Sequence, residues 1–91
     1  MSDWFVYVLR CGDESLYTGI TTDVPRRLAE HQSNGPKAAK YLRGRGPLEL
    51  VFSAPVGGKS AALIVERWIK AQPKSRKEEL VAGRLTWPGQ G

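Results

Sequence analysis

The chain has 91 residues, of which 41% are hydrophobic and 25% charged, as is usual for a folded globular domain and unusual for a disordered one. This length supports one domain with a modest core and excludes two. Fourteen Lys and Arg residues against nine acidic ones give a net charge of +5, which favours an anionic partner without choosing between nucleic acid and a membrane surface.

The cysteine count and the N-terminus indicate the compartment. Cys11 is the only cysteine, so an intrachain disulfide and a multi-cysteine zinc site are excluded, and a lone thiol fits a reducing compartment. No apolar run approaches the ~20 residues that span a bilayer. The N-terminus lacks the basic and apolar segments of a secretory signal. We therefore expect a cytoplasmic protein with no membrane contact.

The first 21 residues predict a β-hairpin. WFVYVLR (4–10) is aromatic and β-branched and apolar on both alternating faces, which is typical of a central strand buried on two sides. CGDES (11–15) supplies a turn, and LYTGIT (16–21) returns as a second strand. A turn with an odd number of residues places Tyr7 and Tyr17 on the same face of the sheet, whereas an even number separates them.

The next segment, TDVPRRLAEHQSNG (22–35), predicts a short helix. Thr22 or Asp23 is its N-cap, Pro25 lies in its first turn, and Asn34-Gly35 ends it.

This helix has one mostly apolar face, because successive residues are ~100° apart. The face carries Val24, Arg27, Leu28 and His31. Arg26 and Glu30 lie on the opposite side. An arginine on the apolar side needs a partner or an anionic ligand, so Arg27 is a candidate phosphate-binding residue.

The second half of the chain alternates between basic and apolar segments. PKAAKYLRGRG (36–46) predicts a short basic turn or helix, and PLELVFSA (47–54) a third strand that starts after Pro47. Residues 56–72 predict an apolar helix with Ser60 as a possible N-cap, and Pro73 ends it.

A last amphipathic helix over 74–83 stops at Gly83. We predict a single domain over residues 1–84 and a flexible tail over 85–91. The order β-β-α-(α)-β-α-α predicts an α+β fold, with a small antiparallel sheet covered by helices.

Three side chains supply the chemistry that phosphodiester cleavage requires. The reaction needs a base for the attacking water, a cation for the phosphorane charge and usually a divalent metal. Tyr17, Arg27 and Glu66 are the candidates for these roles. The alternative for each is structural, since tyrosines favour strands, helical arginines are usually solvated, and a partly buried glutamate is often simply paired.

Five segments occur in an order and spacing that resemble the GIY-YIG nuclease superfamily. They are FVY (5–7), YTG (17–19), TTDVPRRLAEH (21–31), KYLRGRGPLELVF (40–52) and AALIVERWIK (61–70). The resemblance covers about residues 4–80 and is strongest to small single-domain bacterial members.

The resemblance implies a fold and a set of roles. The fold is a three-stranded antiparallel sheet flanked by helices. Tyr7 and Tyr17 match the two motif tyrosines, and Tyr17 orients or deprotonates the attacking water. Arg27 stabilises the phosphate charge, and His31 matches a histidine or tyrosine one helical turn later. Glu66 is the sole protein ligand of Mg²⁺ or Mn²⁺, which suffices because such ions keep several waters and take phosphate oxygens.

Two positions depart from the family pattern. Phe5 stands where the name-giving glycine would be, and Ile20 stands where some repair nucleases carry a lysine. These departures keep two alternatives open: a nucleic-acid-binding domain with weak or lost catalysis, and a protein-interaction domain. Other enzyme classes find no support, because the chain has no nucleophile elbow, phosphate-cradling glycine loop or metal-binding histidine pair.

Two basic clusters are candidates for gripping phosphates, the alternative being a solvated surface. The first holds Lys37, Lys40, Arg43 and Arg45, with Tyr41 as a stacking residue. The second holds Arg67, Lys70, Lys74, Arg76 and Lys77. No base-reading module is present. We therefore predict a metal-dependent DNA endonuclease that is structure-specific rather than sequence-specific, in a DNA-repair context, with specificity from a protein partner.

Overall fold

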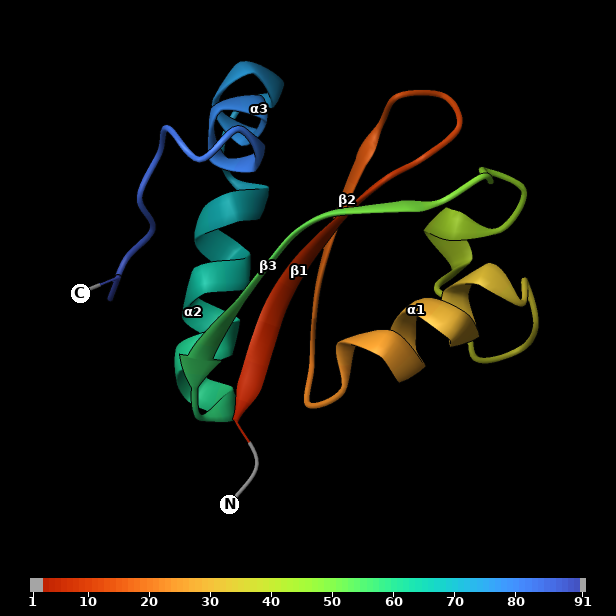
Figure 1. Cartoon of the computed structure of the whole chain (residues 1–91), viewed down its shortest axis with the longest axis horizontal. Coiled ribbons are helices and arrows are strands. Elements are labelled where there is room, and N and C mark those ends of the chain that lie inside the picture. The colour runs from red at the N-terminus through yellow and green to blue at the C-terminus, as the bar shows by residue number, and fades with distance from the viewer. Residues whose placement is uncertain (1–2, 91) are drawn as a thin grey trace.

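The computed structural model describes residues 3–90, which form a three-stranded antiparallel sheet with helices on both faces (Figure 1). The strands are β1 (Trp4–Arg10), β2 (Leu16–Thr21) and β3 (Glu49–Gly57). The helices are α1 (Val24–Gln32), α2 (Lys59–Lys70) and α3 (Lys74–Val81), with a short 3-10 helix η1 (Lys40–Leu42). The predicted α+β fold and its element order are confirmed.

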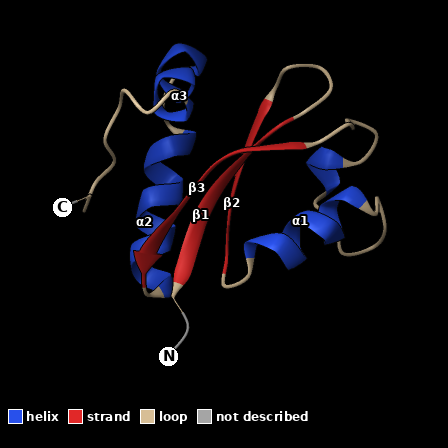
Figure 2. Cartoon of the chain, in the orientation of Figure 1, coloured by secondary structure: helices blue, strands red, loops and turns tan. Residues whose placement is uncertain are grey.

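β1 is the central strand, as its sequence predicts, because the strand order is β2-β1-β3. Alternate side chains of β1 therefore enter two different cores. Val6 packs with Val65, Ile69 and Leu80 beneath α2 and α3. Tyr7 belongs to the other core, beneath α1 and η1. Figure 2 shows the sheet between α2 and α1.

The β1–β2 hairpin brings the two motif tyrosines together. Its turn comprises residues 11–15, an odd number, and the register pairs Tyr7 with Gly19 and Leu9 with Tyr17. Tyr7 and Tyr17 therefore share one face of the sheet, with ring centroids 6.4 Å apart. This arrangement confirms the same-face interpretation of the odd turn.

Gly19 leaves the space that the Tyr7 side chain occupies. A Cβ atom on Gly19 would overlap the Tyr7 hydroxyl and ring. The backbone of Gly19 is not in the left-handed region, so the requirement for glycine comes from this close approach alone. The third residue of YTG therefore fixes where the Tyr7 hydroxyl lies, which is over the edge strand β2.

The helix ends agree with the sequence in one case and differ in another. Asp23 caps α1, since its carboxylate accepts a hydrogen bond from the Arg26 backbone N–H. The expected N-cap Ser60 is wrong: α2 begins at Lys59 with Gly58 in the cap position and no side-chain cap.

The tail expected to be flexible is held against the sheet at two points. Leu85 and Trp87 pack on the core beneath α2 and α3. The Trp87 and Phe52 rings meet edge to face, with their centroids 5.3 Å apart. Leu85 and Trp87 are partly buried by this packing, whereas the other residues of 85–90 are exposed, and the flexibility of the tail stays a prediction. Gly91 lies outside the described residues, as do residues 1 and 2 of the predicted domain. Within residues 3–90, no helix is long and apolar enough to cross a membrane.

Gly19→Ala tests whether the close approach of the Tyr7 side chain requires glycine at position 19. We expect it to lower the free energy of unfolding by about 1–3 kcal/mol, because the added methyl group displaces the Tyr7 ring in a packed core. Gly46→Ala is the matched control, since a Cβ atom there meets nothing within 4 Å, and its effect should stay within about 0.5 kcal/mol. Urea denaturation measures both, and equal effects would contradict the packing argument.

Candidate active site

A buried hydrogen bond links β1 to α1. Tyr7 lies in the middle of β1 and is 2% exposed, while His31 lies in the last turn of α1 and is 1% exposed. The Tyr7 hydroxyl oxygen and His31 Nε2 are 2.8 Å apart. The two residues are 24 positions apart in the chain, so this bond fixes α1 against the sheet at the level of the tyrosines.

The surroundings of His31 assign the direction of this bond. His31 Nδ1 accepts a hydrogen bond from the Ala39 backbone N–H at 3.3 Å, so Nδ1 carries no proton. Burial, together with the nearby Arg27 charge, lowers the pKa of His31 and favours the neutral ring. The single ring proton is therefore on Nε2, which donates to the Tyr7 oxygen. The hydroxyl proton of Tyr7 remains available to a further acceptor.

Tyr7 is held as a neutral phenol. Burial raises the pKa of Tyr7 to about 12, with added contributions from Tyr17 and Glu66, although the nearby Arg27 charge opposes the rise. At neutral pH, Tyr7 is thus suited to donate a hydrogen bond and unsuited to accept a proton.

Tyr17 continues the cluster towards the surface. Its ring centroid lies 5.6 Å from that of His31 and 6.0 Å from that of Tyr41, on which it stacks. The Tyr17 side chain is half-buried, and its hydroxyl makes no hydrogen bond to another group of residues 3–90. A phenol in this position can interact with water or with a ligand.

Tyr41 is covered in turn by an arginine. The Arg45 guanidinium carbon lies 4.2 Å from the Tyr41 ring centroid, and Arg45 forms an ion pair with Asp13 at 2.6 Å. Tyr41 is 43% exposed, so this end of the cluster faces solvent. Tyr17 and Arg45 both contact the Tyr41 ring, to which the sequence assigns base stacking.

Arg27 is half-buried beside the cluster, as its position on the apolar side of the helix predicts. Its guanidinium donates to the Glu30 carboxylate at 2.9 Å and to the Lys37 carbonyl oxygen at 2.7 Å. Arg26 is exposed. The expected position of Glu30 opposite Arg27 is wrong, because residues three apart on a helix are neighbours and the two side chains pair.

Glu66 approaches from the other face of the sheet. It lies on α2, which packs against β2, and its side chain is 18% exposed. The Tyr7 hydroxyl lies over Gly19 at this same edge strand, and the Glu66 charge is close enough to raise the pKa of Tyr7. The direct partner of Glu66 is Lys70, at 3.3 Å. The expected residues therefore lie on both sides of the β2 edge, and no hydrogen bond or ion pair joins Glu66 to Tyr17 or Arg27 within residues 3–90.

Glu66 fits a divalent ion only as a single ligand. Within residues 3–90, no group of three or more His, Cys, Asp or Glu side chains is arranged to hold a metal. Mg²⁺ commonly binds through one or two carboxylates while keeping waters and substrate phosphate oxygens as its other ligands. The mostly buried Glu66 carboxylate could hold such an ion as its one protein ligand, and the remaining ligands would then be waters and phosphate oxygens.

The residues expected to grip phosphates fall into two groups. The first group lies on the segment that follows α1 and comprises Lys37, Lys40, Tyr41, Arg43 and Arg45. Two contacts hold this segment at the site: the Lys37 carbonyl accepts a hydrogen bond from Arg27, and the Tyr41 ring stacks on Tyr17. Lys70 lies on α2 beside Glu66.

Three residues that contribute to the site are not among the sequence candidates. Gly19 makes room for Tyr7, Glu30 holds Arg27, and Asp13 holds Arg45. Two of these could have been predicted from the sequence: Gly19, because it belongs to the YTG motif, and Glu30, because it lies three residues after Arg27 on a helix. The Asp13–Arg45 ion pair could not have been predicted in this way, because the two residues are 32 positions apart in the chain.

The pH dependence of stability tests the state of His31, the only histidine in the chain. Its pKa in the folded protein lies below the unfolded value of ~6.5, so the unfolded state binds more protons as the pH falls below ~6.5. We expect the free energy of unfolding to decrease there, by at most about 1.4 kcal/mol per pH unit. Urea denaturation between pH 7 and 5, above the range where carboxylates titrate, measures this slope. His31→Phe should remove it, and an unchanged slope would refute the assignment.

Comparisons with known proteins place this geometry in a family. The family model described as the GIY-YIG catalytic domain matches residues 3–79. A UPF0213 protein of Cronobacter sakazakii is 58% identical over 87 residues, covering 96% of this chain and 90% of that relative. A UPF0213 protein of Vibrio cholerae is 63% identical over 83 residues, covering 90% of this chain and 80% of that relative.

A solved structure agrees with the fold. The solution NMR structure of a UPF0213 protein from Bacillus halodurans matches with a TM-score of 0.58 and 42% identity, covering 97% of this chain and 87% of that one. The chain therefore belongs to the GIY-YIG nuclease superfamily, as one of its small members.

Proposed function

We propose that this chain is a divalent-metal-dependent endonuclease that hydrolyses DNA phosphodiester bonds and selects its substrate by structure rather than by sequence. The observation that carries the proposal is the cluster of Tyr7, Tyr17 and His31 with Arg27 beside it and Glu66 across the edge of β2. Membership of a nuclease family gives this cluster its chemical context.

The two phenols take different roles. Tyr17, half-buried and without a protein hydrogen-bond partner in residues 3–90, accepts a hydrogen bond from the attacking water, and it could take the water's proton only as a phenolate that has first lost its own proton to solvent. Tyr7 stays neutral, because its pKa is raised to about 12, and donates its hydroxyl hydrogen to the water or to a phosphate oxygen. His31 holds Tyr7 in the orientation for this donation.

Arg27 and Glu66 supply the charges. Arg27 is held by Glu30 and the Lys37 carbonyl, and a phosphate oxygen is a natural further partner for its guanidinium. A divalent ion on Glu66 would lower the pKa of bound water and stabilise the charge of the transition state. The basic segment after α1 and Lys70 contact phosphates without reading bases.

One observation favours the alternative of a nucleic-acid-binding domain with weak catalysis. Ile20, at the position where some relatives carry a lysine, packs against the core beneath α2 and α3. No cation from that position can therefore lower the pKa of a neighbouring phenol. A DNA-repair context, a cytoplasmic location and a protein partner that supplies specificity stay predictions.

Glu66→Gln tests the metal role. The substitution keeps the side-chain volume and removes the charge, so we expect the fold to remain and Mg²⁺- or Mn²⁺-dependent nicking to fall to background. Supercoiled plasmid and branched oligonucleotides are the substrates, and Mn²⁺ binding in the presence of DNA gives a second readout. Nicking at the rate of the parent protein would reject the assignment. A parent protein that binds DNA without nicking would support the binding-domain alternative, and one that does neither would support a protein-interaction domain.

Substitutions of Arg26 and Arg27 test whether only the arginine on the apolar face of α1 acts in cleavage. Arg27→Ala should reduce cleavage by about 10²–10³-fold, because the group that stabilises the phosphate charge is lost. Arg26→Ala should reduce it less than about threefold, since Arg26 is an exposed cation. Initial nicking rates at saturating metal measure both, and similar losses would contradict the assigned roles.

A further inference from the structure

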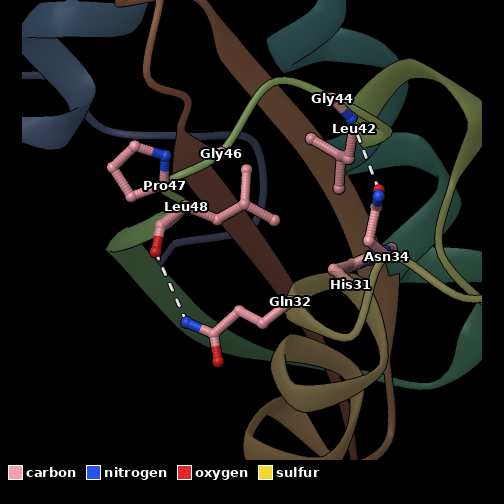
Figure 3. Close-up of a pocket in the computed structure, with 8 residues that line it drawn as sticks. All are labelled: His31, Gln32, Asn34, Leu42, Gly44, Gly46, Pro47 and Leu48. Carbon is pink, nitrogen blue, oxygen red and sulfur yellow. Dashed lines mark hydrogen bonds between the residues drawn. The ribbon is translucent and has the colours of Figure 1, made fainter.

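A cavity of about 430 Å³ lies beside the tyrosine cluster, between the end of α1 and the segment 42–48 (Figure 3). This volume falls within the ~300–1,000 Å³ range of small-molecule sites. His31 lines the cavity and also binds Tyr7, so the cavity and the cluster share one residue. None of the roles proposed above uses this space.

The lining of the cavity is mostly apolar, and its polar side chains are uncharged. Leu42, Pro47 and Leu48 supply its apolar surface, and His31, the one titratable residue that lines it, is neutral. The cavity lies at the C-terminal end of α1, where the helix dipole is negative. A phosphate or carboxylate is therefore disfavoured inside, and a flat, uncharged ring is favoured.

Two side-chain amides bridge α1 to the segment that closes the cavity. Gln32 Nε2 donates to the Leu48 carbonyl at 3.4 Å, and Asn34 Oδ1 accepts from the Gly44 N–H at 3.4 Å (Figure 3). These bonds leave Gln32 Oε1 and Asn34 Nδ2 without a protein partner within residues 3–90. One acceptor and one donor on the α1 side of the cavity thus have no protein partner in this part of the chain.

Arginines flank the cavity along the chain. Arg43 and Arg45 alternate with the lining residues Leu42, Gly44 and Gly46. Arg45 is held by Asp13, and Arg43 donates to the Pro36 carbonyl at 3.4 Å. A ligand with an uncharged ring and an adjoining phosphate therefore meets an apolar space and nearby cations.

We infer that this cavity receives the base of an unpaired nucleotide next to the scissile phosphate, so that the substrate class is single-stranded or locally unpaired nucleic acid. The inference rests on the proposed function, because the phosphate of that nucleotide is the one presented to Tyr17 and Arg27. A base inside a duplex is stacked on both sides and cannot enter a cavity without being unstacked. Recognition by shape and unpairing also fits a chain that has no base-reading module.

Gly46→Leu tests the inference. A Cβ atom at Gly46 meets nothing within 4 Å and the backbone there is not in the left-handed region, so the added side chain occupies open space beside the cavity without displacing the core. Gly58→Leu adds the same side chain at an equally open glycine before α2. Asn34→Ala is a second variant, which removes the unpaired Nδ2 donor together with the bond that Oδ1 accepts from Gly44.

The experiment measures anisotropy of a labelled strand that continues from a short duplex, without divalent metal, so that the junction fixes the register, and scans the single-stranded part with one abasic nucleotide at each position. The parent protein and Gly58→Leu should bind the single strand more tightly than the duplex and lose about tenfold in affinity at one abasic position. Gly46→Leu should bind the intact strand about tenfold more weakly, with no further loss at that position. Asn34→Ala should show a smaller abasic penalty than the parent protein.

The outcomes separate this inference from the proposed function. A flat abasic scan in the parent protein, or a Gly46→Leu variant that keeps the full abasic penalty, overturns the base cavity. If no abasic position weakens binding but nicking still depends on Glu66, the nuclease proposal stands and only the base cavity is rejected. If the parent protein binds no nucleic acid of either kind, both proposals fail.

Discussion

The hydrogen bond between the Tyr7 hydroxyl and His31 is buried at both ends and joins the central strand to α1. Removing either partner leaves a buried polar group unsatisfied, at a cost of about 1–3 kcal/mol. Two backbone features sustain the bond. Gly19 gives the Tyr7 hydroxyl its space, and the Ala39 N–H assigns the proton of His31 to Nε2. The orientation of Tyr7, the position of α1 and the packing of Tyr17 all follow from this contact.

The site depends on both faces of a thin sheet. The aromatic cluster and Arg27 lie on the α1 side, whereas Glu66 belongs to α2 on the other side, and the edge strand β2 lies between them. Glu66 and Arg27 are each paired with a neighbour on the same helix, Lys70 and Glu30. Such partly exposed pairs stabilise little, so both side chains could exchange partners with the proposed phosphate and cation. A small fold thereby supplies a cation and a carboxylate without burying an unpaired charge.

The sequence predicts the elements of this fold well, because the signals are local. The continuous apolar run of β1, the cap at Asp23 and the stop at Gly83 are each set within a few residues. The same-face placement of Tyr7 and Tyr17 follows from the turn length alone. Contacts between distant residues are not readable in this way. The packing of Trp87 on Phe52, the Asp13–Arg45 pair and the cavity beside His31 depend on how separate segments meet in space. Ser60 resembles a cap residue, but α2 begins one residue earlier.

The protonation of the His31 ring at neutral pH is the most direct test of this arrangement, and ¹⁵N NMR of the single histidine reports it. We expect a neutral ring that carries its proton on Nε2, with Nδ1 unprotonated and a ring N–H close in space to the Tyr7 ring. A ring protonated on Nδ1, or one that carries both protons at neutral pH, would contradict the donation to Tyr7 and with it the assignment of Tyr7 as a neutral donor.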